Sequence, residues 1–80
     1  MINWQNHIHT DSKILLGKPV VKGTRLSVDF ILERFASGWT EEMVLKNYPR
    51  LTREDIQAVF AYAYECTLDS MMFSKSLAAA

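Results

Sequence analysis

The sequence contains one cysteine, three glycines and two prolines in 80 residues, and these low counts exclude several classes of protein. Cys66 alone cannot form an internal disulfide, so the chain lacks the framework of a small secreted domain and fits a reducing compartment. No apolar run approaches the ~18 residues of a membrane helix, and the first residues lack a signal-peptide pattern. We therefore expect a soluble, cytoplasmic protein with no membrane partner.

Catalytic and metal-binding patterns are also missing. His7 and His9 would lie on one side of a strand, but no cysteine or carboxylate stands at the spacing of a metal site. Gly23 and Thr24 do not form a phosphate loop, because the glycine spacing and the trailing Lys-Ser/Thr are absent. We expect no enzymatic activity, no metal and no cofactor, and we interpret both histidines as exposed or lightly packed.

The net charge is zero, but the charges are unevenly distributed. Four cations and one acid precede Leu26, whereas four cations and eight acids lie between Leu26 and Asp69. A basic segment therefore leads into an acidic body. At 49%, the apolar content is generous for a domain that buries only about 60% of its unfolded surface. This excess predicts contact with another chain.

One helix-starting device occurs three times. Three hydroxyl residues are predicted N-caps: Ser27, Thr40 and Thr52. An apolar residue stands directly before each cap and another stands four residues after it, which is the hydrophobic-staple pattern. The staple pairs are Leu26 with Ile31, Trp39 with Val44, and Leu51 with Ile56. This pattern predicts helices over about 28–37, 41–47 and from 53 to as far as 69, which together favour a helix-turn-helix.

Other local signals complete the predicted fold. Gly38 suits a left-handed helix end, Pro49 stops the second helix, and Asp55 is the capping-box acid of the third. Before the helices, short β-compatible runs predict a two-stranded ribbon. These runs are Ile8-His9-Thr10, Ile14-Leu15-Leu16 and Val20-Val21. The fold class is thus mainly α: a trihelical bundle after a β ribbon, with a C-terminal helical extension. We expect a flexible N-terminus over 1–7, one domain over 8–69, and a tail over 70–80 whose last four residues resemble a vector-derived end.

The third predicted helix carries no charge from Ala58 to Tyr64. A helix that is apolar all round is buried on more than one side, and a monomer of this size has few elements to cover both. We therefore expect a homodimer. Its predicted interface consists of Val59, Phe60, Tyr62, Ala63 and Tyr64. The apolar residues that follow would form an adaptable partner-binding tail, namely Leu68, Met71, Met72 and Phe73.

Two strings, Ile14–Leu32 and Ser37–Glu65, resemble a small bacterial family catalogued as domain of unknown function 433. Its recurring elements are GKPVI-x-GTRI-x-V, SGW-S/T-x-E-x-I-L and YP-x-L-T-x-x-D-I-x-A-A-L-x-YA, and the likeness covers about residues 8–65. The matching residues are Gly17, Lys18, Pro19, Val20, Gly23, Thr24, Arg25, Val28, Gly38, Trp39, Glu42, Leu45, Tyr48, Pro49, Leu51, Thr52, Asp55, Ile56, Ala58, Tyr62 and Ala63. The departures are Leu26, Val44 and Val59-Phe60, of which only the last alters the packing volume.

The resemblance implies a homeodomain-like trihelical fold. For some members it also implies a VapB-like antitoxin role, in which the protein binds a PIN-like ribonuclease toxin and its helix-turn-helix binds operator DNA. In such a motif the N-terminal part of the second motif helix enters the major groove. In this chain the base-facing residues would be Arg50, Arg53 and Gln57, since arginine can read guanine and glutamine can read adenine.

The basic residues before the first helix are the stronger candidates for phosphate contact. They are Lys18, Lys22 and Arg25. Arg25 has an equally good structural interpretation, in which its guanidinium ties loop carbonyls or a helix acid. Glu54 and Asp55, by contrast, would repel phosphates beside the third helix.

Two hypotheses follow from these residues. The first is a dimeric DNA-binding antitoxin or small transcriptional regulator of a toxin–antitoxin pair. The second is a protein–protein interaction module whose acidic body masks a basic toxin surface and which binds little DNA.

Overall fold

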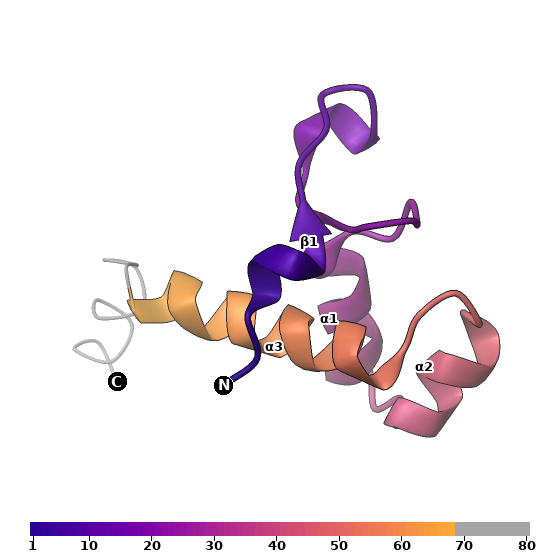
Figure 1. Ribbon diagram of the computed structural model, residues 1–80. Coiled ribbons are helices and arrows are strands. Elements are labelled where there is room, and N and C mark those ends of the chain that lie inside the picture. The colour runs from indigo at the N-terminus through magenta and orange to yellow at the C-terminus, as the bar shows by residue number, and fades with distance from the viewer. Residues whose placement is uncertain (69–80) are drawn as a thin grey trace.

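The computed structural model describes residues 1–68, in which three helices follow a two-stranded sheet (Figure 1). The helices are α1 (Val28–Ala36), α2 (Glu41–Asn47) and α3 (Arg53–Leu68). This arrangement confirms the predicted fold class and places the helix ends within a residue or so of the predicted ones. Within the described part of the chain, no helix is both long enough and apolar enough to cross a membrane.

Each helix begins at its predicted N-cap hydroxyl. The hydroxyl oxygens accept the backbone N–H three residues on: Ser27 from Phe30 at 3.2 Å, Thr40 from Met43 at 3.2 Å, and Thr52 from Asp55 at 3.1 Å. Each such cap contributes about 1 kcal/mol to stability, because it satisfies a donor that the helix itself cannot pair. Gly38 adopts the predicted left-handed conformation, with φ 96°, just after α1 ends.

The core takes side chains from every major element. The most deeply buried large residues, each under 2% exposed, are Val20 and Val21 of the sheet, Ile31 of α1, Val44 of α2 and Val59 of α3. Burying each side chain is worth about 1.5–3 kcal/mol. The prediction for Val59 is therefore wrong: its side chain lies in the chain's own core and cannot face a second copy.

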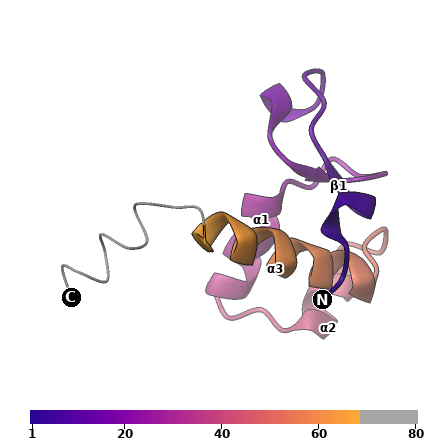
Figure 2. The ribbon, with the colours of Figure 1, turned by 60° about the vertical axis from the view of Figure 1, so that its left-hand side comes forward.

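The sheet is shorter than the ribbon that the sequence predicts. Strand β1 (Ile8–His9) pairs antiparallel with β2 (Val20–Val21), in the register Ile8 to Val21 and His9 to Val20. The intervening run Ile14-Leu15-Leu16 is not a strand, because Leu15 and Leu16 have left-handed φ angles of 48° and 57° in the 3-10 turn η2 (Leu15–Gly17). Figure 1 and Figure 2 show this connection, residues 10–19, projecting away from the helices; we call it the arm.

The N-terminal segment, residues 1–7, differs from the expected flexible end. It contains the 3-10 turn η1 (Trp4–Asn6) and crosses α3 (Figure 1). The Trp4 ring meets Tyr62 edge-on at 4.8 Å between centroids, and Trp4 Nε1 donates to a carboxylate oxygen of Glu65. The chain itself thus covers α3 at Tyr62, one of the residues that the sequence analysis assigned to a dimer partner.

Candidate nucleic-acid interface

Three exposed cations lie on two distant segments that a hydrogen bond joins where α2 leads into α3. Arg50, in the α2–α3 turn, donates from Nη1 to the carbonyl oxygen of Gly23 at 3.2 Å, across 27 positions of sequence. This bond brings Arg50 to the loop that carries Lys22 and Arg25. Within residues 1–68, none of the three forms an ion pair with a carboxylate. We call Lys22, Arg25 and Arg50 the basic cluster.

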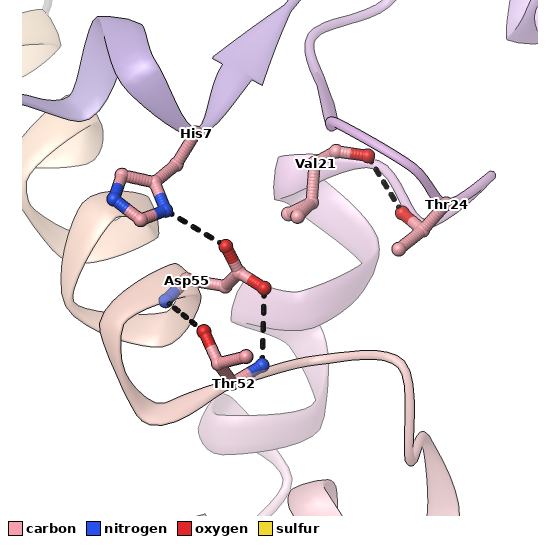
Figure 3. Close-up of polar contacts among 5 residues, drawn as sticks. All are labelled: His7, Val21, Thr24, Thr52 and Asp55. Carbon is pink, nitrogen blue, oxygen red and sulfur yellow. Dashed lines mark hydrogen bonds and ion pairs between the residues drawn. The ribbon is translucent and has the colours of Figure 1, made fainter.

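The loop that carries the cluster is held by its own hydrogen bonds. Thr24 Oγ1 donates to the Val21 carbonyl at 2.8 Å (Figure 3) and accepts the Leu26 N–H at 3.0 Å. Gly23 takes a φ of 79°, which glycine adopts readily and most other residues do not. The sequence Gly23-Thr24 therefore shapes a turn whose backbone is fixed, so the backbone that carries Lys22 and Arg25 has little entropy left to lose on binding.

An open groove of about 700 Å³ separates this loop from the α2–α3 turn. Its walls are mainly apolar, from Ile14, Leu26, Tyr48 and Pro49, and Arg25 and Arg50 belong to its lining. Its remaining lining residues are His9, Gly23, Thr24 and Asn47, so no carboxylate lines it. A groove with cations and no acid is suited to an anionic ligand.

Two other predicted contact residues are neutralised. Lys18 Nζ lies 3.2 Å from Asp29 Oδ2, and Arg53 Nε lies 2.6 Å from Glu41 Oε1. The Ser27 hydroxyl, and after it Lys18, lowers the pKa of Asp29. Such exposed ion pairs are worth only about 0–1 kcal/mol, so a phosphate can compete for either cation. The carboxylate of each pair would nevertheless lie close to that phosphate and repel it.

The structural role that the sequence analysis offered for Arg25, tying a loop carbonyl, is filled by Arg50. Arg50, not Arg25, ties the loop carbonyl, and in the described residues the Arg25 side chain makes neither an ion pair nor a hydrogen bond to another side chain. This observation removes the main competing role for Arg25.

One exposed face of α3 has two unlike halves. Its residues are Arg53, Gln57, Phe60, Tyr64 and Leu68, at the three- and four-residue spacing that aligns side chains on a helix. The first two are polar, and the last three are apolar with exposed fractions of 44%, 51% and 65%. The polar half adjoins the turn that carries Arg50, whereas the apolar half runs toward the C-terminal end of α3.

The predicted dimer interface is thus divided by the structure. Phe60 and Tyr64 remain exposed on α3, and Ala63 is half-buried. Tyr62 instead contacts Trp4, and Val59 is in the core. In the predicted tail, Leu68 is exposed, and Met71, Met72 and Phe73 lie outside the described residues.

The Asp55 carboxylate is largely covered, and both of its oxygens have partners within the chain. One of its carboxylate oxygens accepts the Thr52 N–H at 3.0 Å, and the other lies 2.8 Å from His7 Nδ1 (Figure 3). Its side chain is only 14% exposed. Sequence reasoning missed this His7–Asp55 pair because the two residues are 48 positions apart. Over residues 1–68, no three His, Cys, Asp or Glu side chains gather in a group that could hold a metal ion.

Comparison with known families gives one match. A family model described as "Protein of unknown function (DUF433)" matches residues 8–63, which include the basic cluster, the arm and the first turns of α3. No curated protein and no solved structure matches the chain. Trp4, His7 and Tyr64 lie outside the matched range.

Proposed function

The chain belongs to the DUF433 family, whose function is unknown, and we propose that it is a cytoplasmic DNA-binding regulator of the antitoxin type. The basic cluster contacts phosphates, and the polar half of the α3 face enters the major groove. The protein acts by binding and not as an enzyme.

The observation that carries the proposal is the basic cluster. Lys22, Arg25 and Arg50 are exposed, free of carboxylate partners in the described residues, and gathered beside a helix-turn-helix. In such motifs, phosphate contacts fix the register of the protein while the second motif helix reads bases. Arg53 and Gln57 occupy that reading position; Arg53 exchanges Glu41 for the DNA when it binds.

A homodimer would double the number of phosphate contacts. The three cations of the basic cluster give six contacts in a dimer, and these contacts alone should make the logarithm of the affinity fall with the logarithm of the salt concentration with a slope near −5. Phe60 and Tyr64, on the apolar half of the α3 face, are the exposed residues on which two copies could pair. A mass near 9.2 kDa in light scattering at micromolar concentration would remove the dimer from the proposal.

Gel retardation of the DNA upstream of the protein's own gene tests the proposal. We expect binding at about 50 mM salt and a loss of roughly a thousandfold in affinity at about 200 mM. Arg25→Ala should weaken binding and make the salt slope shallower by about two in a dimer. Lys46→Ala, an exposed lysine of α2 outside the cluster, is the matched control and should leave the slope nearly unchanged.

Absence of retardation at low salt, with the protein alone and with the product of the adjacent gene, would overturn DNA binding. If DNA is bound but Arg25→Ala leaves the salt slope unchanged, the basic cluster is not the phosphate site.

A second candidate function is a protein module that masks a PIN-like ribonuclease toxin. The observation in its favour is the exposed apolar half of the α3 face, Phe60, Tyr64 and Leu68, which is an unusual surface for a monomer in solution. If the toxin binds this apolar surface, Tyr64→Glu should dissociate a purified complex with the adjacent gene product, because it places a charge within the contact. Retention of that complex, with DNA binding intact, favours the first function.

A further inference from the structure

The tip of the arm holds two exposed leucines in an unfavourable backbone conformation. Leu16 is 98% exposed and Leu15 is 42% exposed, and both have positive φ angles. Apolar L-residues rarely adopt this conformation. Because the Leu16 side chain is almost fully exposed, no burial offsets the energetic cost of its backbone conformation. Strained residues of this kind cluster at functional positions, so the tip points to a binding role.

Backbone hydrogen bonds set the shape of the arm. Asp11 starts it by accepting two N–H groups: its carbonyl takes that of Ile14 at 2.8 Å, and its side chain takes that of Lys13 at 2.9 Å. The Ile14 carbonyl then accepts the Gly17 N–H at 3.0 Å. The arm is thus a series of tight turns that presents Leu16 in a fixed position.

Near the tip, positive charges outnumber negative ones by one: Lys13, Lys18 and Arg25 stand against Asp11 and Asp29. A hollow of about 450 Å³ beside the tip is lined by Leu15, Leu16, Lys18, Arg25, Leu26, Ser27 and Phe30. No carboxylate lines this hollow, although Asp29 forms an exposed ion pair with Lys18. Lys13 is also exposed, and it precedes the two leucines in sequence as Lys18 follows them. The leucines are therefore flanked along the chain by positive charges that would attract phosphates.

We propose that the arm is a DNA wedge: Leu16 inserts between adjacent base pairs and kinks the duplex, while Lys13, Lys18 and Arg25 contact the flanking phosphates. Apolar side chains flanked by cations are the elements that architectural proteins use to unstack a base step. A protein partner fits less well, because two side chains supply little of the ~800 Å² per partner in a stable interface. The wedge rests on the proposed DNA-binding function and adds that the DNA is bent.

The bend can be measured by energy transfer between dyes on the two ends of a duplex of about 30 base pairs with a central TA step, which kinks easily. At low salt the unchanged protein should shorten the end-to-end distance, as a kink of roughly 20–90° requires. Leu16→Asn should abolish the bend, because asparagine tolerates the left-handed backbone but has no apolar side chain to insert. Its affinity should fall by no more than about tenfold, and its salt slope should not change, since every cation remains.

Two further variants control this experiment. Leu16→Met retains a long apolar side chain and should still bend the duplex. Met43→Ala removes a side chain on α2 that is 42% exposed, like Leu15, and should leave bend and affinity unchanged.

The outcomes separate the wedge from the proposed function. The wedge is overturned if the unchanged protein binds the duplex without bending it, or if Leu16→Asn bends it equally. Either result leaves DNA binding in place. If Leu16→Asn leaves the bend intact but dissociates a complex with the adjacent gene product, the tip is a protein contact and the wedge is wrong. Absence of DNA binding by every variant overturns the proposed function and the wedge together.

Discussion

The N-terminal segment and the arm are neighbours in sequence and opposites in structure. The segment packs on α3 through side chains, with Trp4 against Tyr62 and His7 beside Asp55. The arm projects from the body, and its turns are held by its own backbone hydrogen bonds. One segment completes the fold, whereas the other displays strained apolar residues to solvent.

Within the first twenty residues, we therefore expect the N-terminal segment to serve stability and the arm to serve binding. The contacts of the N-terminal segment reach as far as 61 positions along the chain, so its residues should matter mainly to the free energy of unfolding. The conformation at the tip of the arm is locally costly, by about 1–2 kcal/mol for each left-handed leucine. Its residues should therefore matter mainly to binding, and substitutions in the two regions should have opposite effects on stability.

Trp4→Ala should have the largest effect on stability. It removes the aromatic contact with Tyr62 and the hydrogen bond to Glu65, and it uncovers one side of α3. We expect the free energy of unfolding to fall by about 2–3 kcal/mol, less than for a fully buried tryptophan. Urea denaturation monitored by circular dichroism measures this change. Trp4→Phe keeps a ring but not the N–H donor and should cost about 1 kcal/mol. A change within error for Trp4→Ala would show that the segment contributes nothing to the fold.

Asp55→Ala should have the next largest effect. It removes the acceptor of the Thr52 N–H and the partner of His7, and we expect a loss of about 1–2 kcal/mol. In a double-mutant cycle with His7→Ala, the coupling should be about 0.5–1.5 kcal/mol. Glu54→Ala is the matched control, since this neighbouring acid of the same turn should contribute only about 0.3 kcal/mol. A coupling of zero would mean that the segment and α3 are not joined through this pair.

Leu16→Asn tests the arm and should act in the opposite direction. Asparagine adopts left-handed φ angles more readily than leucine, and the leucine side chain is almost fully exposed, so little packing is lost. The free energy of unfolding should rise by roughly 0.5–1 kcal/mol, as measured in the same urea titration. Leu15→Asn should gain less, because Leu15 is partly covered. A destabilisation of the Trp4→Ala size would erase the contrast between the two regions.

The smallest effect concerns Tyr62, the aromatic partner of Trp4. Burial, and after it the neighbouring Cys66 thiol, raises the pKa of Tyr62 above its ordinary value of 10.0. The folded state thus favours the protonated phenol. The contribution of Tyr62 to the free energy of unfolding is complete below pH 10 and is lost as the pH rises through the folded-state pKa. Absorbance titration should show a late step of tyrosine ionisation, and Tyr62→Phe should remove that step. Late ionisation that persists in Tyr62→Phe would assign the shift to another tyrosine.

Local signals explain why so much of the fold was predictable. Ser27, Thr40 and Thr52 each bond a backbone N–H only three residues away, so the device that starts each helix is complete within a short stretch of sequence. The same is true of Gly38 at the end of α1. The arm is the exception among local features, because the run Ile14-Leu15-Leu16 is compatible with a strand, yet Leu15 and Leu16 adopt a conformation that leucine disfavours.

The candidate interface was predictable only in part. The sequence identified Lys22, Arg25 and Arg50 as candidates but assigned Arg50 to base reading, apart from the other two. It predicted the capping-box contact between Thr52 and Asp55, but it could not show that Glu41 neutralises Arg53 or that His7 pairs with Asp55. Each of these two missed contacts joins residues whose separation leaves no periodic signal.

The sequence by itself determined the three helices, their caps and the family, because these depend on residues a few positions apart. Only the tertiary structure decided which cations are free, which aromatic residues cover α3, and which leucines face solvent. The physical reason is the same in each case. A side chain's charge or apolar surface is fixed by its type, but whether that charge is paired or that surface is buried depends on a partner brought close by folding.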